Sequence, residues 1–318
     1  MNYDVFNGDA DGIISLLQLR LHTPVDATLV TGVKRDINLV KQVDVAAASS
    51  VTVLDISMEK NIAAVEQLLN NNVPVFYADH HRSGNIPESS LLNANIDLDA
   101  NTCTALIIDN LLDGAYHLWA IAAAYGDNLI AKADTLSRSA SLSTEQSELL
   151  KELGTLVNYN GYGSNISDLH FHPADLYREL IKYPNPFDMI QDEKSAFNQL
   201  RQAYVEDMAQ AQAIAARYTG EYLEVFELPD EPWARRISGV YGNMLANLSP
   251  SKAHAVLTQN ADKSYTVSLR APLLNKVGAG DVCSQFDTGG GRAAAAGINS
   301  LSSTDIERFI NMTEDFYS

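Results

Sequence analysis

The first 130 residues alternate between short apolar runs and longer stretches with helical spacing. Apolar runs of strand length lie at 3–6, 27–31, 51–54 and 73–77. Helix-like stretches, such as 13–21 and 61–69, separate them. This alternation is typical of βαβ units, which form a mostly parallel sheet with helices on both faces. Ligands bind such a sheet beyond the carboxyl ends of its strands, so the residues that follow each strand are candidates for a binding site.

The second half of the chain predicts a helical region and then another mixed α/β unit. From residue 102 to about 217 the pattern is mainly helical, and the Ala- and Gln-rich stretch 196–217 has the spacing of a connecting helix. Strands are expected at 222–228, 255–259 and 265–270, with a helix at 238–248, and a Gly-rich turn followed by helices after them. We therefore predict an N-terminal α/β domain over residues 1–195, a connecting helix or linker over 196–220 and a smaller C-terminal α/β domain over 221–318. The active site is expected in the cleft between the two domains.

Composition and length exclude several classes of protein. The 318 residues are 46% hydrophobic, which rules out a disordered chain, and about 100–200 residues per domain again suggests two domains. Cys103 and Cys283 form no ligand or disulfide pattern and are expected to pack as small apolar side chains in a reducing compartment. No signal peptide is evident, and the most apolar stretch, 118–125, is far shorter than the roughly 20 residues that a bilayer requires. A cytoplasmic protein without membrane contact is expected.

The charge disfavours one kind of partner. With 22 Lys and Arg against 40 Asp and Glu, the formal net charge is −18. Long duplex DNA is bound by clustered cations that displace counterions from phosphates, so this chain is not expected to bind it. Residues 231–300 are the exception, because their seven Lys and Arg outnumber four acids. An acidic chain can still bind nucleotides where metal ions supply the positive charge.

Acidic side chains and histidines follow several predicted strands. Asp9 and Asp11 come after the first strand, Asp55 after the third, and the triplet 79–81 (Asp-His-His) after the fourth, while Asp127 follows an Ala-rich helix. If these groups meet at one sheet edge, the carboxylates repel one another unless a cation lies between them. Oxygen and imidazole ligands together suit Mn²⁺ in particular, and Mg²⁺ or Co²⁺ in its place.

Each of these pieces also has a purely structural explanation. Asp-Ala-Asp-Gly is most often a turn, a single Asp after a strand is often a helix N-cap, and paired histidines often lie on the surface. The pieces nevertheless occur together and in order, each at the end of a predicted strand or helix. Their joint occurrence favours a metal site over four independent turns and caps.

The same residues resemble the DHH family of phosphoesterases. The triplet Asp79-His80-His81 matches the family's namesake motif. The segment 268–270 (Ser-Leu-Arg) and the segment 289–297 (Gly-Gly-Gly-Arg-Ala-Ala-Ala-Ala-Gly) resemble its C-terminal DHH-associated domain. The family includes RecJ-type exonucleases, enzymes that degrade nanoRNA and pAp, cyclic-dinucleotide phosphodiesterases and family II pyrophosphatases. The C-terminal segments favour the phosphodiesterase branch over the pyrophosphatases.

The resemblance implies a centre with two metal ions. Asp9 would bind one ion and Asp11 the other, while Asp55 would bridge them. His80 and Asp127 would complete the coordination of the second ion. Two ions about 3.5–4 Å apart lower the pKa of a bound water and hold a phosphate for in-line attack.

Two further residues of the namesake motif take part in the implied chemistry. His81 would contact the phosphate or stabilise the charge of the transition state. Asp79 is expected to orient a histidine rather than to bind metal. The chain departs from the family at Val5, where many members carry a histidine. Valine cannot bind metal, so the ion at Asp9 is expected to be weaker, to use water or the amide of Asn7, or to be absent.

In the C-terminal part, the resemblance implies a site for the substrate. Gly289, Gly290 and Gly291 can approach a phosphate or base closely because they carry no Cβ. Arg270 and Arg292 would add guanidinium groups suited to a phosphate. Arg292 stands where the family usually has histidine, which leaves contacts with the base or ribose open.

Other residues remain open between two interpretations. Lys34 and Arg35, in the loop after the second strand, either reach the substrate or lie on the surface. Tyr159 and Tyr162 either stack on a base or pack between domains. The His170-x-His172 pair is expected to lie in a loop rather than to bind metal.

Together these features predict a Mn²⁺-dependent phosphoesterase that hydrolyses short nucleotide substrates, namely nanoRNA, pAp or dinucleotides. A RecJ-like exonuclease acting on long single strands is the alternative enzyme. A nucleotide-binding regulatory protein that has lost turnover is the alternative from another class. The sequence leaves the oligomeric state open, a homodimer included.

Overall fold

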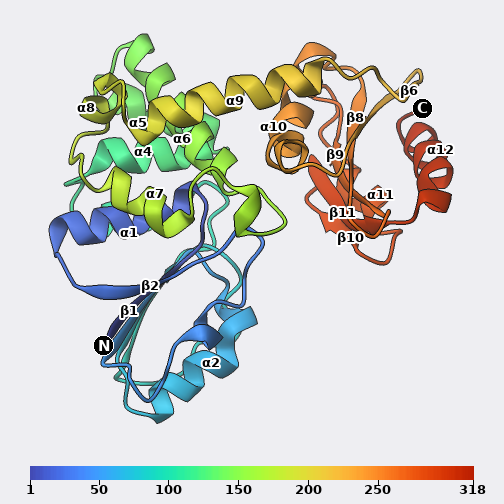
Figure 1. The fold of residues 1–318 in the computed structure, drawn as a ribbon. Helices are drawn as coiled ribbons and strands as arrows, with labels where there is room; N and C mark the ends of the chain where they lie inside the picture. Colours follow the sequence, from blue (N-terminus) through green and yellow to red (C-terminus); the bar gives the residue numbers. More distant parts are fainter. The chain divides into compact units, whose positions relative to one another are not determined.

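A computed structural model describes residues 1–318, which divide into two compact units, Met1–Gln202 and Ala203–Ser318. Figure 1 shows an α/β unit followed by a second unit built on its own sheet. The long helix α9 (Ala196–Gln212) crosses the boundary between the two units in sequence.

The first unit contains a five-stranded parallel sheet in the order β2-β1-β3-β4-β5. Its strands are β1 (Asn2–Phe6), β2 (Ala27–Val30), β3 (Ser50–Leu54), β4 (Val75–Asp79) and β5 (Leu92–Ile96). The edge strand β5 was not predicted, because its two asparagines are disfavoured in strands, although Leu-Asn-Ala-Asn-Ile alternates apolar and polar residues. Phe6 pairs with Leu54 and Leu54 with Ala78, so the carboxyl ends of β1, β3 and β4 are level.

Helices cover both faces of this sheet, as predicted, with α2 on one face and α1 on the other (Figure 1). The helices of the unit are α1 (Ala10–His22), α2 (Met58–Asn70), α3 (Thr104–Leu111), α4 (His117–Gly126), α5 (Ile130–Ser139), α6 (Thr144–Asn160), α7 (Pro173–Leu180) and α8 (Pro186–Gln191). Short 3₁₀ turns lie at Val40–Gln42 and Ile166–Asp168. One apolar core joins the sheet to α2, and Val5, Val53, Val65 and Tyr77 belong to it.

Helices α4 and α6 pack unusually closely. A Cβ at Gly154 of α6 would lie 1.9 Å from the carbonyl oxygen of Ala122 in α4, so only glycine fits there. This close packing positions the residues at the ends of the two helices. Asp127 directly follows α4, and Asn158 lies in the last turn of α6.

A buried ion pair ties α1 to the sheet. The Arg20 guanidinium in α1 donates to both carboxylate oxygens of Asp4 in β1, through Nε at 2.8 Å and through Nη2. It also donates to Thr52 Oγ1 in β3, at 3.1 Å. The pair therefore fixes the angle between β1 and α1, which the turn 7–9 connects.

The second unit contains a six-stranded sheet in the order β10-β11-β9-β8-β7-β6. Its strands are β6 (Tyr218–Thr219), β7 (Leu223–Leu228), β8 (Ala253–Gln259), β9 (Tyr265–Arg270), β10 (Gly289–Gly291) and β11 (Ala295–Leu301). Its helices are α10 (Pro232–Leu248), α11 (Ala279–Cys283) and α12 (Ile306–Tyr317), with a 3₁₀ turn at Ser303–Asp305. Only β7 and β8 pair in parallel; the other pairs are antiparallel. The unit has its own apolar core, which includes Leu257, Val267 and Phe309.

The expected helix directly after the triple glycine is wrong. Gly289–Gly291 is strand β10, Arg292 lies in a hairpin loop, and the Ala-rich segment continues as strand β11. Alanine favours a helix, but pairing with β9 supplies the backbone hydrogen bonds of the segment. Glycine allows the close approach, since a Cβ at Gly297 would lie 2.8 Å from the carbonyl oxygen of Val267.

Cys103 and Cys283 are both free and buried, as predicted. None of the helices combines the length and the apolar character needed to cross a membrane.

Candidate metal centre

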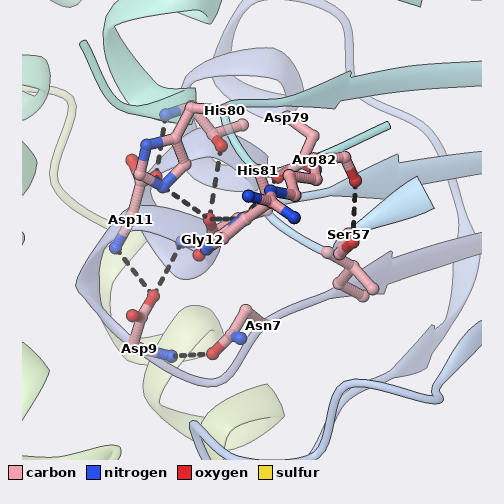
Figure 2. Close-up of polar contacts among 12 residues, drawn as sticks. Asn7, Asp9, Asp11, Gly12, Ser57, Asp79, His80, His81 and Arg82 are labelled. Atoms are coloured by element: carbon pink, nitrogen blue, oxygen red, sulfur yellow. Dashed lines mark hydrogen bonds and ion pairs between the residues drawn. The ribbon is translucent and has the colours of Figure 1, made fainter. Parts of the chain in front are cut away.

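The turn between β1 and α1 presents Asp9 at the carboxyl edge of the sheet. Asp9 is the N-cap of α1, and its Oδ1 accepts from the backbone N–H groups of Asp11 at 3.0 Å and Gly12 at 3.1 Å (Figure 2). Asn7 Oδ1 in turn accepts from the backbone of Asp9, at 3.2 Å. A Cβ at Gly12 would lie 2.3 Å from the Asn7 carbonyl oxygen, so this turn requires glycine. The structural explanation of the motif, a capped turn, is therefore correct for Asp9.

Asp11 lies in the first turn of α1, and its carboxylate faces the start of α3. Its Oδ2 accepts from the backbone N–H of Thr104 and its Oδ1 from that of Ala105, both at 2.7 Å. These N–H groups open helix α3, so the positive end of that helix stabilises the carboxylate. The side chain of Asp11 is thus held in place before any ligand binds.

Asp55 follows β3 in a backbone conformation that few residues adopt. Its φ is +59°, in the left-handed region where Asp and Asn are the best tolerated residues after glycine. Its backbone N–H donates to the Ala78 carbonyl at 3.0 Å, and its Oδ1 accepts from Thr104 Oγ1 at 3.3 Å. The chain direction changes here, and the buried carboxylate turns toward Asp11.

The two histidines after β4 face this carboxylate. His80 Nε2 lies 3.5 Å from Asp55 Oδ1 and 3.7 Å from Asp11 Oδ2. His81 Nδ1 lies 3.7 Å from Asp55 Oδ1. Ligand atoms of Asp55, His80 and His81 lie within 4.8 Å of one another, as a metal site requires. Figure 2 shows the His80 ring next to Asp11.

Asp79 is the last residue of β4 and orients His81. Its Oδ1 lies 2.7 Å from His81 Nδ1, and the hydrogen bond with Asp79 raises the pKa of His81, although burial acts in the opposite direction. The side chain of Asp79 is fully buried, whereas that of His81 is 48% exposed. The second carboxylate oxygen of Asp79 is buried without a hydrogen-bond partner.

The carboxylates of this cluster carry uncompensated negative charge. Burial, followed by the charges of Asp11 and Asp9, raises the pKa of Asp55 well above its usual value. Burial and Asp11 likewise raise the pKa of Asp127 to about 6, although Lys34 and His80 oppose this shift. A divalent cation would relieve the repulsion. The mixed set of carboxylates and imidazoles fits Mn²⁺, and the structure brings Asp55, His80 and His81 together with Asp11 beside them.

Lys34, which the sequence left open between the substrate and the surface, pairs with Asp9 in the structure. Its ammonium lies 2.6 Å from Asp9 Oδ2 and donates to Asn158 Oδ1 at 3.0 Å. Burial is the largest single influence and would raise the pKa of Asp9, but the charge of Lys34 and several hydrogen bonds, the one from Lys34 included, together lower it to about 2. The sequence feature that pointed to a role for Lys34 was its position in the loop after β2. That strand proved to neighbour β1 in the sheet, an order that the sequence does not reveal.

Neither Val5, which replaces the family's histidine, nor the alternative ligand Asn7 is free to hold an ion at Asp9. Val5 lies in the apolar core with its side chain fully buried. The side-chain amide of Asn7 builds the turn instead, since it accepts from Asp9 and donates to the Lys34 carbonyl at 3.2 Å. Neither residue is placed as a metal ligand.

The residues predicted to bind substrate lie together within the second unit. Arg270 ends β9 and pairs across the sheet with Ala295, next to the loop that contains Arg292. Helix α10 holds the Arg270 guanidinium, which donates to Asn243 Oδ1 at 2.6 Å and to the Gly239 carbonyl at 3.1 Å. A Cβ at Gly290 would meet no atom within 4 Å, so this edge of β10 is open to a ligand.

The positive excess of residues 231–300 does not extend to the whole second unit, in which nine Lys and Arg stand against fourteen Asp and Glu. Three of its seven basic residues in 231–300 form ion pairs within the unit. These pairs are Arg235 with Asp230, Arg236 with Asp207 and Lys252 with Glu224.

The remaining histidines and tyrosines have structural roles. His170 Nε2 lies 2.9 Å from the hydroxyl of the buried Tyr159, and His172 caps α7. Both histidines lie in a loop, as expected. Tyr162 packs against Lys34, whose ammonium lies 5.5 Å from the centre of its ring.

We expect the metal-free protein to lose stability as the pH rises from about 4 to above 6. The pKa values of Asp55 and Asp127 are raised in the folded state. Their contribution to stability is therefore complete below pH 3.8, the ordinary pKa of an aspartate. The contribution of Asp127 is lost as the pH rises through about 6. The lowered pKa of Asp9 acts in the opposite sense, but only as the pH falls from 3.8 through about 2.

Melting temperatures measured with and without Mn²⁺ between about pH 5 and pH 8 test this expectation. The increase caused by Mn²⁺ should widen toward high pH, because the cation neutralises the carboxylates. An increase that stays constant over this range would contradict it.

No protein-family model matches the chain, and no curated protein matches it. Solved structures do. A RecJ structure from Thermus thermophilus in complex with Mn²⁺ matches 99% of this chain at 15% identity, with a TM-score of 0.66. The chain spans only 52% of the length of that RecJ.

Two other structures match over a larger share of their own length. An exonuclease RecJ bound to manganese has a TM-score of 0.59 at 14% identity, with 99% of this chain and 89% of that chain covered. The pGpG-specific phosphodiesterase PggH from Vibrio cholerae has a TM-score of 0.55 at 14% identity, with 99% and 100% covered. At these identities the likeness establishes the fold. The chain therefore has the α/β fold of RecJ and PggH, as its resemblance to the DHH phosphoesterases implied.

Proposed function

We propose that this protein is a Mn²⁺-dependent phosphoesterase that hydrolyses phosphate ester bonds in short nucleotide substrates. The observation that carries the proposal is the cluster of Asp55, His80 and His81 beside Asp11 at the carboxyl edge of the sheet. Its carboxylates repel one another without a cation, and RecJ, which shares the fold, was solved with Mn²⁺.

The residues of the cluster have separate tasks in this proposal. When bound, a divalent cation polarises the phosphate and lowers the pKa of an attacking water. Asp11, Asp55, His80 and Asp127 hold the cation. Backbone N–H groups of α3 fix Asp11, so this ligand needs no rearrangement.

His81 is the residue proposed to contact the phosphate. Asp79 holds one ring nitrogen at 2.7 Å, and this carboxylate also favours the protonated imidazole. The half-exposed ring can then donate from its other nitrogen to a phosphate oxygen. We expect such a donor to act mainly by stabilising the negative charge that develops on the phosphate in the transition state.

In the second unit, Arg270, Arg292 and the glycines 289–291 are proposed to bind the substrate. The bonds from α10 to Arg270 hold a guanidinium in one orientation, which favours a fixed phosphate position. The open edge at Gly290 leaves room for a base or a ribose.

Short substrates fit the charge of the chain better than long strands do. A net charge of −18 disfavours an extended polyanion away from the metal centre. PggH, which is specific for pGpG, matches this chain over its full length. We therefore propose nanoRNA, pAp or a dinucleotide as substrate. A RecJ-like exonuclease is the second candidate, supported by the likeness to RecJ over 99% of the chain.

We expect Mn²⁺-dependent release of mononucleotide from a labelled dinucleotide, faster than from a long single strand. Side-by-side assays of pGpG, pAp, a short RNA and a long single strand, by chromatography, would rank these substrates. Arg270→Met should raise KM about tenfold or more with little change in kcat, since it removes a charged hydrogen bond made on binding.

For this assay the control is His80→Ala, because it removes a proposed metal ligand. It should be inactive on every substrate, which separates the activity of this chain from that of a contaminating nuclease. If wild type and His80→Ala are equally inactive while pGpG still binds, the enzyme proposal fails. The chain would then be a nucleotide-binding protein.

A further inference from the structure

We propose that the Lys34 ammonium takes the place of one of the two divalent ions that the DHH resemblance implies, so that this site binds a single ion. The inference rests on the metal centre of the proposed function. It concerns the side of the site at Asp9, where the residues present do not suit a second ion.

Both oxygens of the Asp9 carboxylate are already engaged. Oδ1 caps helix α1 through the backbone N–H groups of Asp11 and Gly12, at 3.0 and 3.1 Å. Oδ2 pairs with the Lys34 ammonium at 2.6 Å. Asp9 is buried, with 5% of its side chain exposed. An ion bound to Oδ2 of Asp9 would have to displace the Lys34 ammonium or share that oxygen with it, against the repulsion of a partly buried positive charge.

Several contacts fix Lys34 in this position. Its backbone N–H donates to the Gly161 carbonyl at 2.9 Å, and its carbonyl accepts from Asn7 Nδ2 at 3.2 Å. Its ammonium also donates to Asn158 Oδ1 at 3.0 Å and lies 5.5 Å from the ring centre of Tyr162. Contacts from α6, from the loop after it and from the turn after β1 thus hold one flexible side chain.

The charges are consistent with an ion on one side of the site only. The ammonium neutralises Asp9, so little net negative charge remains there to attract a divalent ion, and a cation placed beside it would be repelled. Val5 adds no ligand, because it lies in the core. The carboxylates of Asp11 and Asp55 carry no such partner, and the two histidines face them.

The ammonium can also perform the task of the missing ion. It carries three protons, of which Asp9 and Asn158 accept two. The third can be donated to a phosphate oxygen of the substrate. Lys34 would then be a catalytic residue, a fixed positive charge that holds the phosphate opposite the bound cation.

Titration of the full chain with Mn²⁺ alone, by calorimetry and electron paramagnetic resonance, tests the proposal. We expect one Mn²⁺ per chain and a spectrum of isolated rather than spin-coupled ions. Asp55→Asn should abolish this binding. Two Mn²⁺ per chain in the wild type would overturn the single-ion proposal and leave the proposed function standing, whereas no binding at all would contradict both.

The double variant Asp9→Asn/Lys34→Met is the decisive control. It leaves the net charge unchanged, keeps a side-chain oxygen that can cap α1 and leaves no unpaired buried charge, so it is expected to fold. It should still bind one Mn²⁺ with affinity within about threefold of wild type. If Asp9 binds metal instead, an ion is lost or the affinity falls by at least the roughly 10–100-fold typical of residues that only support a ligand.

Turnover of the same double variant tests the catalytic part. The loss of a donor to the phosphate should lower kcat by about 100-fold or more while the bound Mn²⁺ remains. Wild-type kcat in this variant would show that Lys34 does not contact the reacting phosphate.

Discussion

Asp55→Asn should lower Mn²⁺-dependent turnover by at least about 10³-fold while making the metal-free protein more stable. Asp55 lies at the centre of the acidic cluster, close to both histidines. Its charge is therefore expected to contribute most to binding the cation. The same charge is unfavourable without a cation, because burial and the neighbouring carboxylates Asp11 and Asp9 raise its pKa. Removing it relieves repulsion in the metal-free protein.

Asparagine suits this position for a further reason. Asp55 has a φ of +59°, and Asn tolerates that region as well as Asp does, so the backbone is not strained by the change. Its side chain has the same shape and can still accept from Thr104. A loss of activity can then be attributed to the loss of charge.

Differential scanning fluorimetry and an activity assay would measure the two effects together. The expected result is a higher melting temperature than wild type without metal and no further increase with Mn²⁺. Asp113→Asn is a matched control, since Asp113 also has a positive φ, +50°, but is exposed in a loop. A variant of Asp55 that keeps activity, or that is stabilised by Mn²⁺ as strongly as wild type, would contradict the assignment.

Arg20→Met should cost about 3–5 kcal/mol of unfolding free energy, because it leaves the Asp4 carboxylate buried without its partner. The side chains of Asp4 and Arg20 are 2% and 10% exposed. Their pair joins β1 to α1 and, through Thr52, to β3. We therefore expect weaker Mn²⁺ binding as well, since the turn that bears Asp9 and Asp11 connects these elements.

Urea denaturation followed by circular dichroism would give the free energy. The double variant Asp4→Val/Arg20→Met is the control, because valine suits a strand and no buried charge remains. It should recover most of the lost stability, since apolar replacement of a whole buried pair is often neutral. If the double variant is as unstable as Arg20→Met alone, packing of the Arg20 stem rather than charge is responsible.

Much of the metal centre could be predicted because the sheet is parallel. The carboxyl ends of parallel strands meet at one edge, so residues after β1, β3 and β4 had to lie near one another once those strands were recognised. Asp11, Asp55 and His80 follow from that rule. Asp127 could also be anticipated, but its place depends on the close packing of α4 against α6 at Gly154.

Two features could not be predicted from local sequence patterns. The Ala-rich segment after Arg292 has the composition of a helix, yet it forms strand β11 because β9 offers a free edge. Lys34 lay in a loop that the pattern could equally place on the surface. Only the neighbouring position of β2 and β1 brings it to Asp9.

Local sequence patterns were enough to predict the alternation of strands and helices and the chemistry of the side chains at the sheet edge. These depend on the period of apolar residues and on the ends of elements, both of which are local. The tertiary structure decided which charges meet. Strand order and helix packing bring Lys34, Asn158 and Asp9 together from distant parts of the chain. Whether a buried carboxylate faces a metal or an ammonium depends on that long-range arrangement, because electrostatic interactions in a buried site are set by distances of a few ångström.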